Sequence, residues 1–230
     1  MADLVQSLPD LIRRWQAGWG VSQGFRPAEQ ARGGLHVLLE RPDRHREIIA
    51  MDPDDDPDSL RSLAGEVAAA SRPTWLTVPT NRPEAVETIA RDAGLELRDE
   101  RESLMSSHLH QHPRRSAPPP YTCITTVDGP VVETVVRHPR SGVAARGTMA
   151  VVGSDAIADR IETVPDHRRR GLGRVVMSSL SEHAAARGAT TGILIATADG
   201  QQLYSALGWT RHATVLIAQC LSAKTSFVGG

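Results

Sequence analysis

The segment that decides the fold reads Thr163-Val-Pro-Asp-His-Arg-Arg-Arg-Gly-Leu-Gly-Arg174. It joins the end of an expected strand to an expected helix, in which apolar residues recur at helical spacing: Leu172, Val175, Val176, Leu180 and Ala184. Unpaired amide groups and the positive end of the helix dipole favour an anion at that N-terminus. Gly171 and Gly173 let a phosphate approach the backbone, and four arginines add charge-assisted hydrogen bonds. The segment therefore predicts a pyrophosphate site.

Spacing excludes two other nucleotide-binding loops. A Walker A loop needs Lys and Ser or Thr after its second glycine, and the dinucleotide fingerprint needs a third glycine where this chain has Val176. Two other interpretations stay open, namely arginines on a solvated helix end and a local nucleic-acid patch. The whole chain has 26 Lys and Arg against 27 Asp and Glu, so its net charge gives no general reason to bind nucleic acid or an anionic membrane.

Two motifs resemble those of the GNAT acetyltransferase superfamily. Arg168-Arg-Arg-Gly-Leu-Gly173 resembles its R/Q-x-x-G-x-G/A acyl-CoA motif, and Leu203-Tyr-Ser-Ala-Leu-Gly-Trp209 resembles its Tyr-x-x-x-Gly-Phe/Trp segment. The resemblance covers about residues 156–209. It implies an α/β (α+β) fold with a mixed, mostly antiparallel sheet and a βαβ acyl-CoA-binding core. It also implies acetyl-CoA as the acyl donor and direct attack by a primary amine in a ternary complex.

The resemblance further implies which residues bind acetyl-CoA. The strand backbone at 161–163 would pair with the pantetheine arm, the amides at 169–174 would take the pyrophosphate, and a polar residue ending the next strand would touch the cofactor. The two strands would be parallel and would splay apart. The residues so implied are Ile161, Thr163, Arg168, Arg169, Arg170, Gly171, Leu172, Gly173, Arg174 and Thr197.

Two side chains are candidates for the chemistry. Tyr204 matches the family's general acid, and a phenol can protonate a departing thiolate. Its helix is expected to begin at Asp199 as N-cap. Glu162 is the candidate general base, unless it merely pairs with an arginine such as Arg160. Strand alternation puts Asp159 on the opposite face, so Asp159 competes for the role only if the register shifts by one.

The prolines of segment 113–120 predict a linker that divides the chain. Before it we expect strands at 47–51, 74–78 and 95 to about 109, with helices at 59–70 and 83–93. After it we expect strands at 122–127, 131–137, 143–152, 156–163, 192–197 and 209–219, with helices at 171–187 and 200–207. The shared order of elements suggests an internal duplication. We therefore expect a degenerate GNAT-like domain at 1–112, a catalytic domain at 121–222 and a flexible tail at 223–230.

The first half is not expected to bind a second acyl-CoA. An acidic run, Asp52-Pro-Asp-Asp-Asp-Pro-Asp58, replaces the glycine loop, and Ala90 stands where the second half has Tyr204. This half would then be a structural platform that forms one wall of the acceptor pocket. We expect one active site per chain. Trp15 and Trp19 lie four apart on an expected helix and favour core packing.

The remaining expectations concern metals, location and partners. His108, His110 and His112 would share a strand face, but no acid lies nearby and no native metal is expected. Two cysteines, no signal peptide and no long apolar run favour a cytoplasmic protein, and the arginine-rich composition suggests a bacterial source. The acceptor is a small-molecule or peptide amine, and the resemblance allows a homodimer. The alternative function is a catalytically silent acyl-CoA sensor or regulatory protein.

Overall fold

The computed structural model describes residues 7–220, which form two compact units. Unit 1 consists of residues up to 25 together with 102–212, and unit 2 consists of 26–101 together with the residues from 213 onward. The tail expected at 223–230 lies outside the described residues. No helix in the described part of the chain is both long enough and apolar enough to cross a bilayer.

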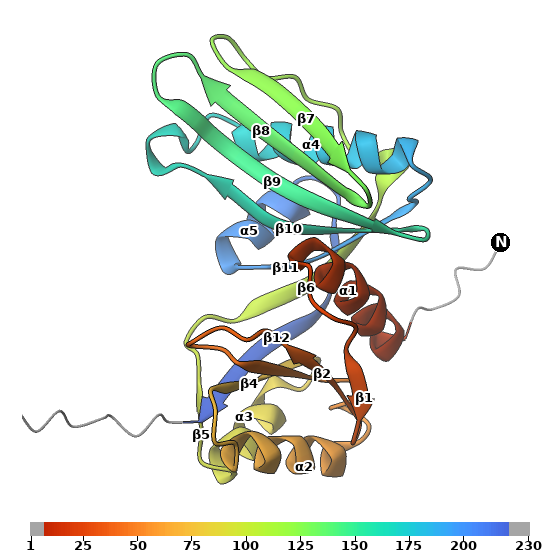
Figure 1. Cartoon of the computed structure of the whole chain (residues 1–230), viewed down its shortest axis with the longest axis vertical. Coiled ribbons are helices and arrows are strands. Elements are labelled where there is room, and N and C mark those ends of the chain that lie inside the picture. Colours follow the sequence, from red (N-terminus) through yellow and green to blue (C-terminus); the bar gives the residue numbers. More distant parts are fainter. Residues whose placement is uncertain (1–6, 221–230) are drawn as a thin grey trace, which may run out of the picture. The chain divides into compact units, whose positions relative to one another are not determined.

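Unit 1 is a mixed sheet between helices (Figure 1). Its strands lie in the order β6-β11-β10-β9-β8-β7, in which β10 and β11 are parallel and the other neighbours antiparallel. The parallel pair and the antiparallel meander β7-β8-β9 were expected, whereas the pairing of β6 with β11 was not. Its elements are α1 (Leu8–Gln23), β6 (Glu102–His108), η1 (Leu109–Gln111), β7 (Thr122–Asp128), β8 (Val131–His138), β9 (Gly142–Val152), β10 (Asp155–Thr163), η2 (Pro165–His167), α4 (Leu172–Ala186), β11 (Thr191–Ala196), α5 (Ala198–Ser205) and the first residues of β12 (Thr210–Cys220).

Helices α1 and α4 cover opposite faces of β10. Ala156 and Ala158 join the apolar core against α4, so the alternating residues at 155, 157 and 159 face α1. There, Arg14 Nε donates to Asp155 Oδ2 at 2.8 Å, and Ser22 Oγ donates to Asp159 Oδ2 at 2.9 Å. Side chains two helical turns apart on α1 therefore meet outward positions four residues apart on the strand, which fixes α1 along β10.

The two tryptophans of α1 are buried, which confirms the expected core packing. The rings of Trp15 and Trp19 stack with centroids 5.4 Å apart, and Phe25 meets Trp19 edge-on at 5.2 Å. This aromatic stack anchors the C-terminal end of α1, whose side chains reach Asp159.

Unit 2 is a smaller sheet with α2 and α3 on one face (Figure 1). The strand order is β1-β2-β3-β4-β12, with β5 also beside β12. Strands β3 and β4 are parallel, and α2 connects them in the sequence. The buried residues of α2 pack with those of α3: Leu60, Leu63 and Val67 with Val86 and Ile89. Its elements are β1 (Glu29–Ala31), β2 (Gly34–Leu38), β3 (Arg46–Ala50), α2 (Pro57–Ala68), β4 (Thr74–Thr80), α3 (Pro83–Asp92) and β5 (Leu95–Leu97).

The two units repeat one order of elements and exchange their last long strands. The order β3-α2-β4-α3 in unit 2 parallels β10-α4-β11-α5 in unit 1. Strand β6 follows the unit 2 elements in sequence but pairs with β11, and β12 follows α5 but pairs with β4. The compact units are therefore not the halves 1–112 and 121–222 that the proline segment suggests.

Two local expectations are wrong. The strand expected from 95 to about 109 is two strands, β5 and β6, because the chain leaves the edge of β12 after Arg98 and continues beside β11. His108, His110 and His112 share no strand face, because the chain turns into η1 at Leu109. Within residues 7–220 no three His, Cys, Asp or Glu side chains are placed to hold a metal.

Candidate active site

A gap between two parallel strands defines the candidate site. Strands β10 and β11 pair only from Asp155–Ile157 to Thr191–Ile193. Beyond that point β10 continues to Thr163 and β11 to Ala196, and over the described residues no further pairing joins them. The β10 backbone at 158–163 therefore has a side without a strand partner, available to an extended ligand. Ile161 and Thr163, two of the predicted cofactor contacts, lie on this segment.

A β-bulge in the same segment changes which carboxylates share a face. Asp159 pairs with Thr148 and Glu162 with Arg146, so β10 has one more residue than β9 across this interval. Arg160 takes up the extra residue with a φ of 52°. Asp159 and Glu162 consequently point to the same side, and the expectation that strict alternation separates them is wrong.

Glu162 lies at the protein surface in an ion pair. Its Oε2 accepts from Arg146 Nε at 3.0 Å and from Arg146 Nη2 at 2.9 Å. Both side chains are 58% exposed. The arginine partner envisaged from the sequence was Arg160, whereas the structure places Arg146 there, because that residue is directly opposite on β9.

Asp159 is more enclosed than Glu162, since its side chain is 19% exposed. Its carboxylate accepts hydrogen bonds from Ser22 Oγ and Gln23 Nε2 of α1, and from the Arg160 amide at 2.9 Å. Its charge also reaches Tyr204: burial first, and then the negative charge of Asp159, raise the pKa of that phenol. Tyr204 therefore keeps its proton at neutral pH and can donate it.

Helix α5 places Tyr204 beside the gap. The helix begins at Thr197, whose hydroxyl accepts the Gly200 amide at 3.2 Å, so the predicted N-cap at Asp199 is wrong by two residues. Gly200 leaves room for the phenol ring, because a Cβ there would lie 3.2 Å from Tyr204 Cε2. The Tyr204 ring is 6% exposed and packs 5.8 Å from the ring of Trp209. Thr197 thus orients α5, and its predicted contact with a cofactor stays a prediction.

The loop before α4 presents a row of backbone amides. Arg169 and Gly171 both adopt positive φ, at 60° and 77°, and Gly171 begins α4 without a side-chain cap. In the stretch 169–173, all of it described, no amide N–H has a hydrogen-bond acceptor. Consecutive unpaired N–H groups at a helix N-terminus form a concave anion site.

The side chains around these amides differ in exposure and in contacts. Arg168 Nε donates to Thr163 O at 3.3 Å, which ties the loop to the end of β10. Gly173 packs closely on α5, since a Cβ at this position would lie 3.1 Å from Leu203 Cδ2. Leu172 is buried in the core, whereas Arg168 to Arg170 are exposed and Arg174 is half-buried. A ligand at this loop could therefore reach the amide of Leu172 but not its side chain.

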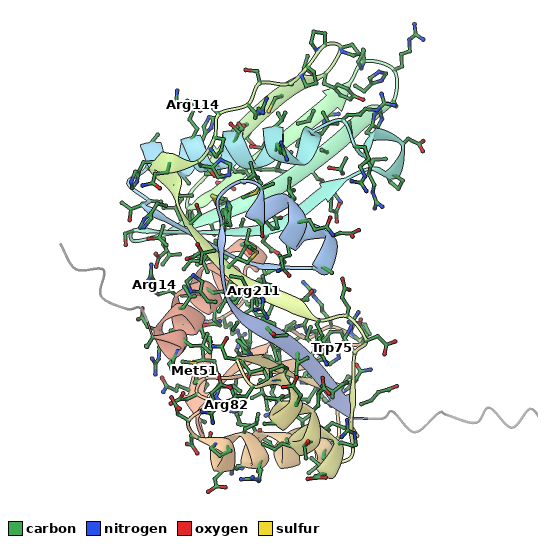
Figure 2. All side chains as sticks on the ribbon, turned by 180° about the vertical axis from the view of Figure 1, so that it is seen from behind. Arg14, Met51, Trp75, Arg82, Arg114 and Arg211 are labelled. Carbon is green, nitrogen blue, oxygen red and sulfur yellow. The ribbon has the colours of Figure 1, made fainter. Side chains whose placement is uncertain are left out.

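The corresponding helix of unit 2 is closed to an anion by its own carboxylates. Helix α2 begins at Asp56, whose Oδ1 accepts the Ser59 amide at 3.0 Å. Asp54 accepts a hydrogen bond from the Asn81 amide at 2.8 Å. It also borders a groove of about 370 Å³ between α2 and α3, which Arg82, labelled in Figure 2, helps to line. Ala90, in the place of Tyr204, is buried in the core. The expectation of one acyl-CoA site per chain stays a prediction.

Comparisons with known proteins agree with this geometry. Residues 148–217 match the family model described as FR47-like protein. A GCN5-related N-acetyltransferase from Kribbella flavida has a TM-score of 0.65 at 16% identity, covering 92% of this chain and 97% of its own. A putative acetyltransferase of the GNAT family from Novosphingobium aromaticivorans has 0.58 at 16%, covering 94% and 100%. A tandem GNAT protein from the clavulanic acid biosynthesis pathway has 0.56 at 12%, covering 80% and 77%. No curated protein matches the chain.

These likenesses confirm the fold and the resemblance that the two motifs indicate.

Sequence reasoning missed the contacts that α1 makes with Asp159, because Ser22 and Gln23 lie more than 130 positions away in the chain. It also missed Tyr121, which follows the proline segment and receives a hydrogen bond from Arg170. No local pattern marks either contact.

Proposed function

We propose that this chain, which carries an FR47-like segment on the fold of the GCN5-related N-acetyltransferases, moves an acetyl group from acetyl-CoA to a primary amine. One observation carries the proposal: β10 and β11 separate after Ile157, with the uncapped start of α4 beside the end of β10. The backbone at 161–163 would hold the pantetheine arm, and the amides at 169–173 would hold the pyrophosphate. Arg168, Arg169 and Arg174 would add positive charge there.

The chemistry we propose for this site is direct attack in a ternary complex. The acceptor nitrogen forms a bond to the thioester carbonyl carbon, and the carbon–sulfur bond breaks. Tyr204 donates its phenolic proton to the leaving sulfur. Because the pKa of Tyr204 is raised, the phenol is protonated and can act as this acid. A carboxylate accepts the proton that the amine loses.

Of the two carboxylates, we assign the base to Asp159 rather than Glu162. Asp159 is enclosed, lies 3.7 Å from Arg160 Nε, and its negative charge contributes to the raised pKa of Tyr204. Glu162 is exposed and bound to Arg146. The two roles then fall on neighbouring groups at the separation of β10 and β11.

Replacing Tyr204 by Phe tests the proposed enzyme. We expect the variant to bind acetyl-CoA with unchanged affinity and to release CoA thiol about 10²- to 10⁴-fold more slowly when amines are supplied, the usual range for loss of a general acid. Affinity is measured by calorimetry and turnover by thiol release. If folded wild-type protein does not bind acetyl-CoA, the proposal is wrong.

One observation favours the alternative, an acyl-CoA sensor without turnover. Both candidate carboxylates are already engaged, Asp159 by α1 and Glu162 by Arg146. A sensor would bind acetyl-CoA at one site per chain and release no thiol with any amine. In that case Tyr204→Phe would change neither quantity.

A further inference from the structure

A chain of hydrogen-bonded polar groups, buried at its centre, lies behind the α4 loop in unit 1. Arg170 Nη1 donates to Tyr121 Oη at 3.1 Å, and Tyr121 Oη lies 2.9 Å from His167 Nδ1. His167 Nε2 lies 2.9 Å from Ser141 Oγ, which lies 3.1 Å from His138 Nδ1. Tyr121 and His167 are each only 7% exposed. The chain of contacts joins the loop to the turn between β8 and β9.

The two ends of this chain set the direction of its hydrogen bonds. A guanidinium can only donate, so the Tyr121 oxygen accepts from Arg170 and keeps its own hydrogen to donate. At the other end the Arg140 amide donates to His138 Nδ1 at 3.4 Å, so the Ser141 hydroxyl also donates to that nitrogen. The Ser141 oxygen then accepts from His167 Nε2, and in this tautomer His167 Nδ1 accepts the Tyr121 hydrogen.

Two members of this network hold the loop on either side of its strained residue. Arg169 has a left-handed φ of 60°, which is unfavourable for a residue other than glycine. His167 lies two residues before it and Arg170 one residue after it, and both bind the same Tyr121 hydroxyl. A single phenol thus fixes the segment from which the unpaired amides project.

We propose that Tyr121 and His167 are positioning residues for the acyl-CoA pyrophosphate. They do not touch the ligand; they hold the 169–173 amides in the conformation that binds it. The inference rests on the proposed function and adds to it two residues outside the motif. Holding the loop before the ligand arrives lowers the ordering cost of binding, so loss of the network weakens affinity.

Tyr121→Phe isolates this role from core packing. The Tyr121 ring packs against the rings of His138 and His167, with centroids 5.3 and 5.6 Å away, and Phe preserves those contacts. The variant removes only the hydroxyl. A matched control is Thr125→Val, which removes a hydroxyl in the same unit that bonds Thr134 and Ser179 at 2.8 and 2.6 Å.

The experiment is calorimetric titration with acetyl-CoA of wild type, Tyr121→Phe, Arg170→Ala, the double variant and Thr125→Val. We expect Tyr121→Phe to weaken affinity about tenfold, within the range for a hydrogen bond to a charged group. We expect the double variant to lose less than the product of the two single losses, because the residues act through one contact. Thr125→Val keeps wild-type affinity, and kcat at saturating acetyl-CoA stays unchanged in Tyr121→Phe.

The outcomes separate the two proposals. If wild-type protein fails to bind acetyl-CoA, the proposed function fails and this inference falls with it. If wild type binds and Tyr121→Phe binds equally well, or if the two losses multiply in full, the positioning role is wrong and the proposed function stands. Should Tyr121→Phe not fold, Ser141→Ala at the exposed turn breaks the next link, and we expect it to weaken affinity in the same direction. Wild-type affinity in that variant would overturn the inference.

Discussion

Gly18→Ala should destabilise unit 1, although alanine is the better helix former. Gly18 lies on α1 directly over Ile157 of β10, and a Cβ at this position would overlap Ile157 Cδ1 and lie 2.5 Å from Cγ1 and 2.8 Å from Cβ. Ile157 is fully buried and cannot move aside. Overpacking of a core usually costs about 1–3 kcal/mol. Because three atoms of Ile157 lie close to the added Cβ, we expect a cost in the upper part of this range. Replacing a helical glycine returns about 1 kcal/mol. The net loss is therefore about 1–2 kcal/mol.

Gly20→Ala on the same helix is the matched control. A Cβ there meets only Gln16 Nε2, at 3.5 Å, which is an ordinary contact. We expect Gly20→Ala to raise stability by about 0.5–1 kcal/mol through helix propensity. The two variants should shift in opposite directions.

The free energy of unfolding of both variants can be measured by urea titration, with the Trp15–Trp19 stack as a fluorescent reporter in unit 1. Because α1 also bonds Asp159, Gly18→Ala should lower kcat more than it raises the KM for acetyl-CoA. A Gly18→Ala protein as stable as wild type would refute the reasoning about close packing of α1 on β10.

Two further predictions concern stability. Burial lowers the pKa of His112, which packs edge-on against Trp209. On acidification the unfolded chain therefore takes up a proton before the folded one, and the free energy of unfolding falls as the pH drops below about 6.5. Urea midpoints at pH 7.5 and 5.5 should differ less in His112→Gln than in wild type. Asp56→Ala removes the N-cap of α2 and should lower the stability of unit 2 by about 1 kcal/mol, measured by hydrogen exchange. Binding of acetyl-CoA to unit 1 should stay unchanged. A second acetyl-CoA site in this variant would contradict the view that Asp56 is one of several obstacles to binding at the start of α2.

Local signals in the sequence predicted most of the elements and the α4 loop. The glycines at 171 and 173, with apolar residues at helical spacing behind them, mark a strand-to-helix junction without reference to the rest of the chain. The separation of β10 and β11 was expected from the family resemblance rather than from any residue pattern. Both features depend on short stretches of sequence.

Features that depend on distant partners were not predicted. The bulge at Arg160 is stabilised by α1, since Arg160 Nη2 donates to Ser22 O at 3.1 Å and Asp159 bonds Ser22 and Gln23. An alternating pattern cannot reveal an extra residue whose conformation is fixed from so far away. The N-cap at Thr197 was missed for a smaller reason: Asp199 is also a good capping residue, and only the observed backbone decides between them.

The exchange of β6 and β12 has a consequence for how the chain can be made and cut. Unit 2 begins at residue 26, yet its sheet lacks β12 until residues from 213 onward have been synthesised. Until then β4 exposes an unpaired edge, which is prone to intermolecular pairing. A truncation after residue 212 would remove none of unit 1 and would still leave unit 2 incomplete. Neither unit can therefore be expressed as one continuous fragment, and unit 2, whose first residues are made directly after α1, is among the last parts to finish folding.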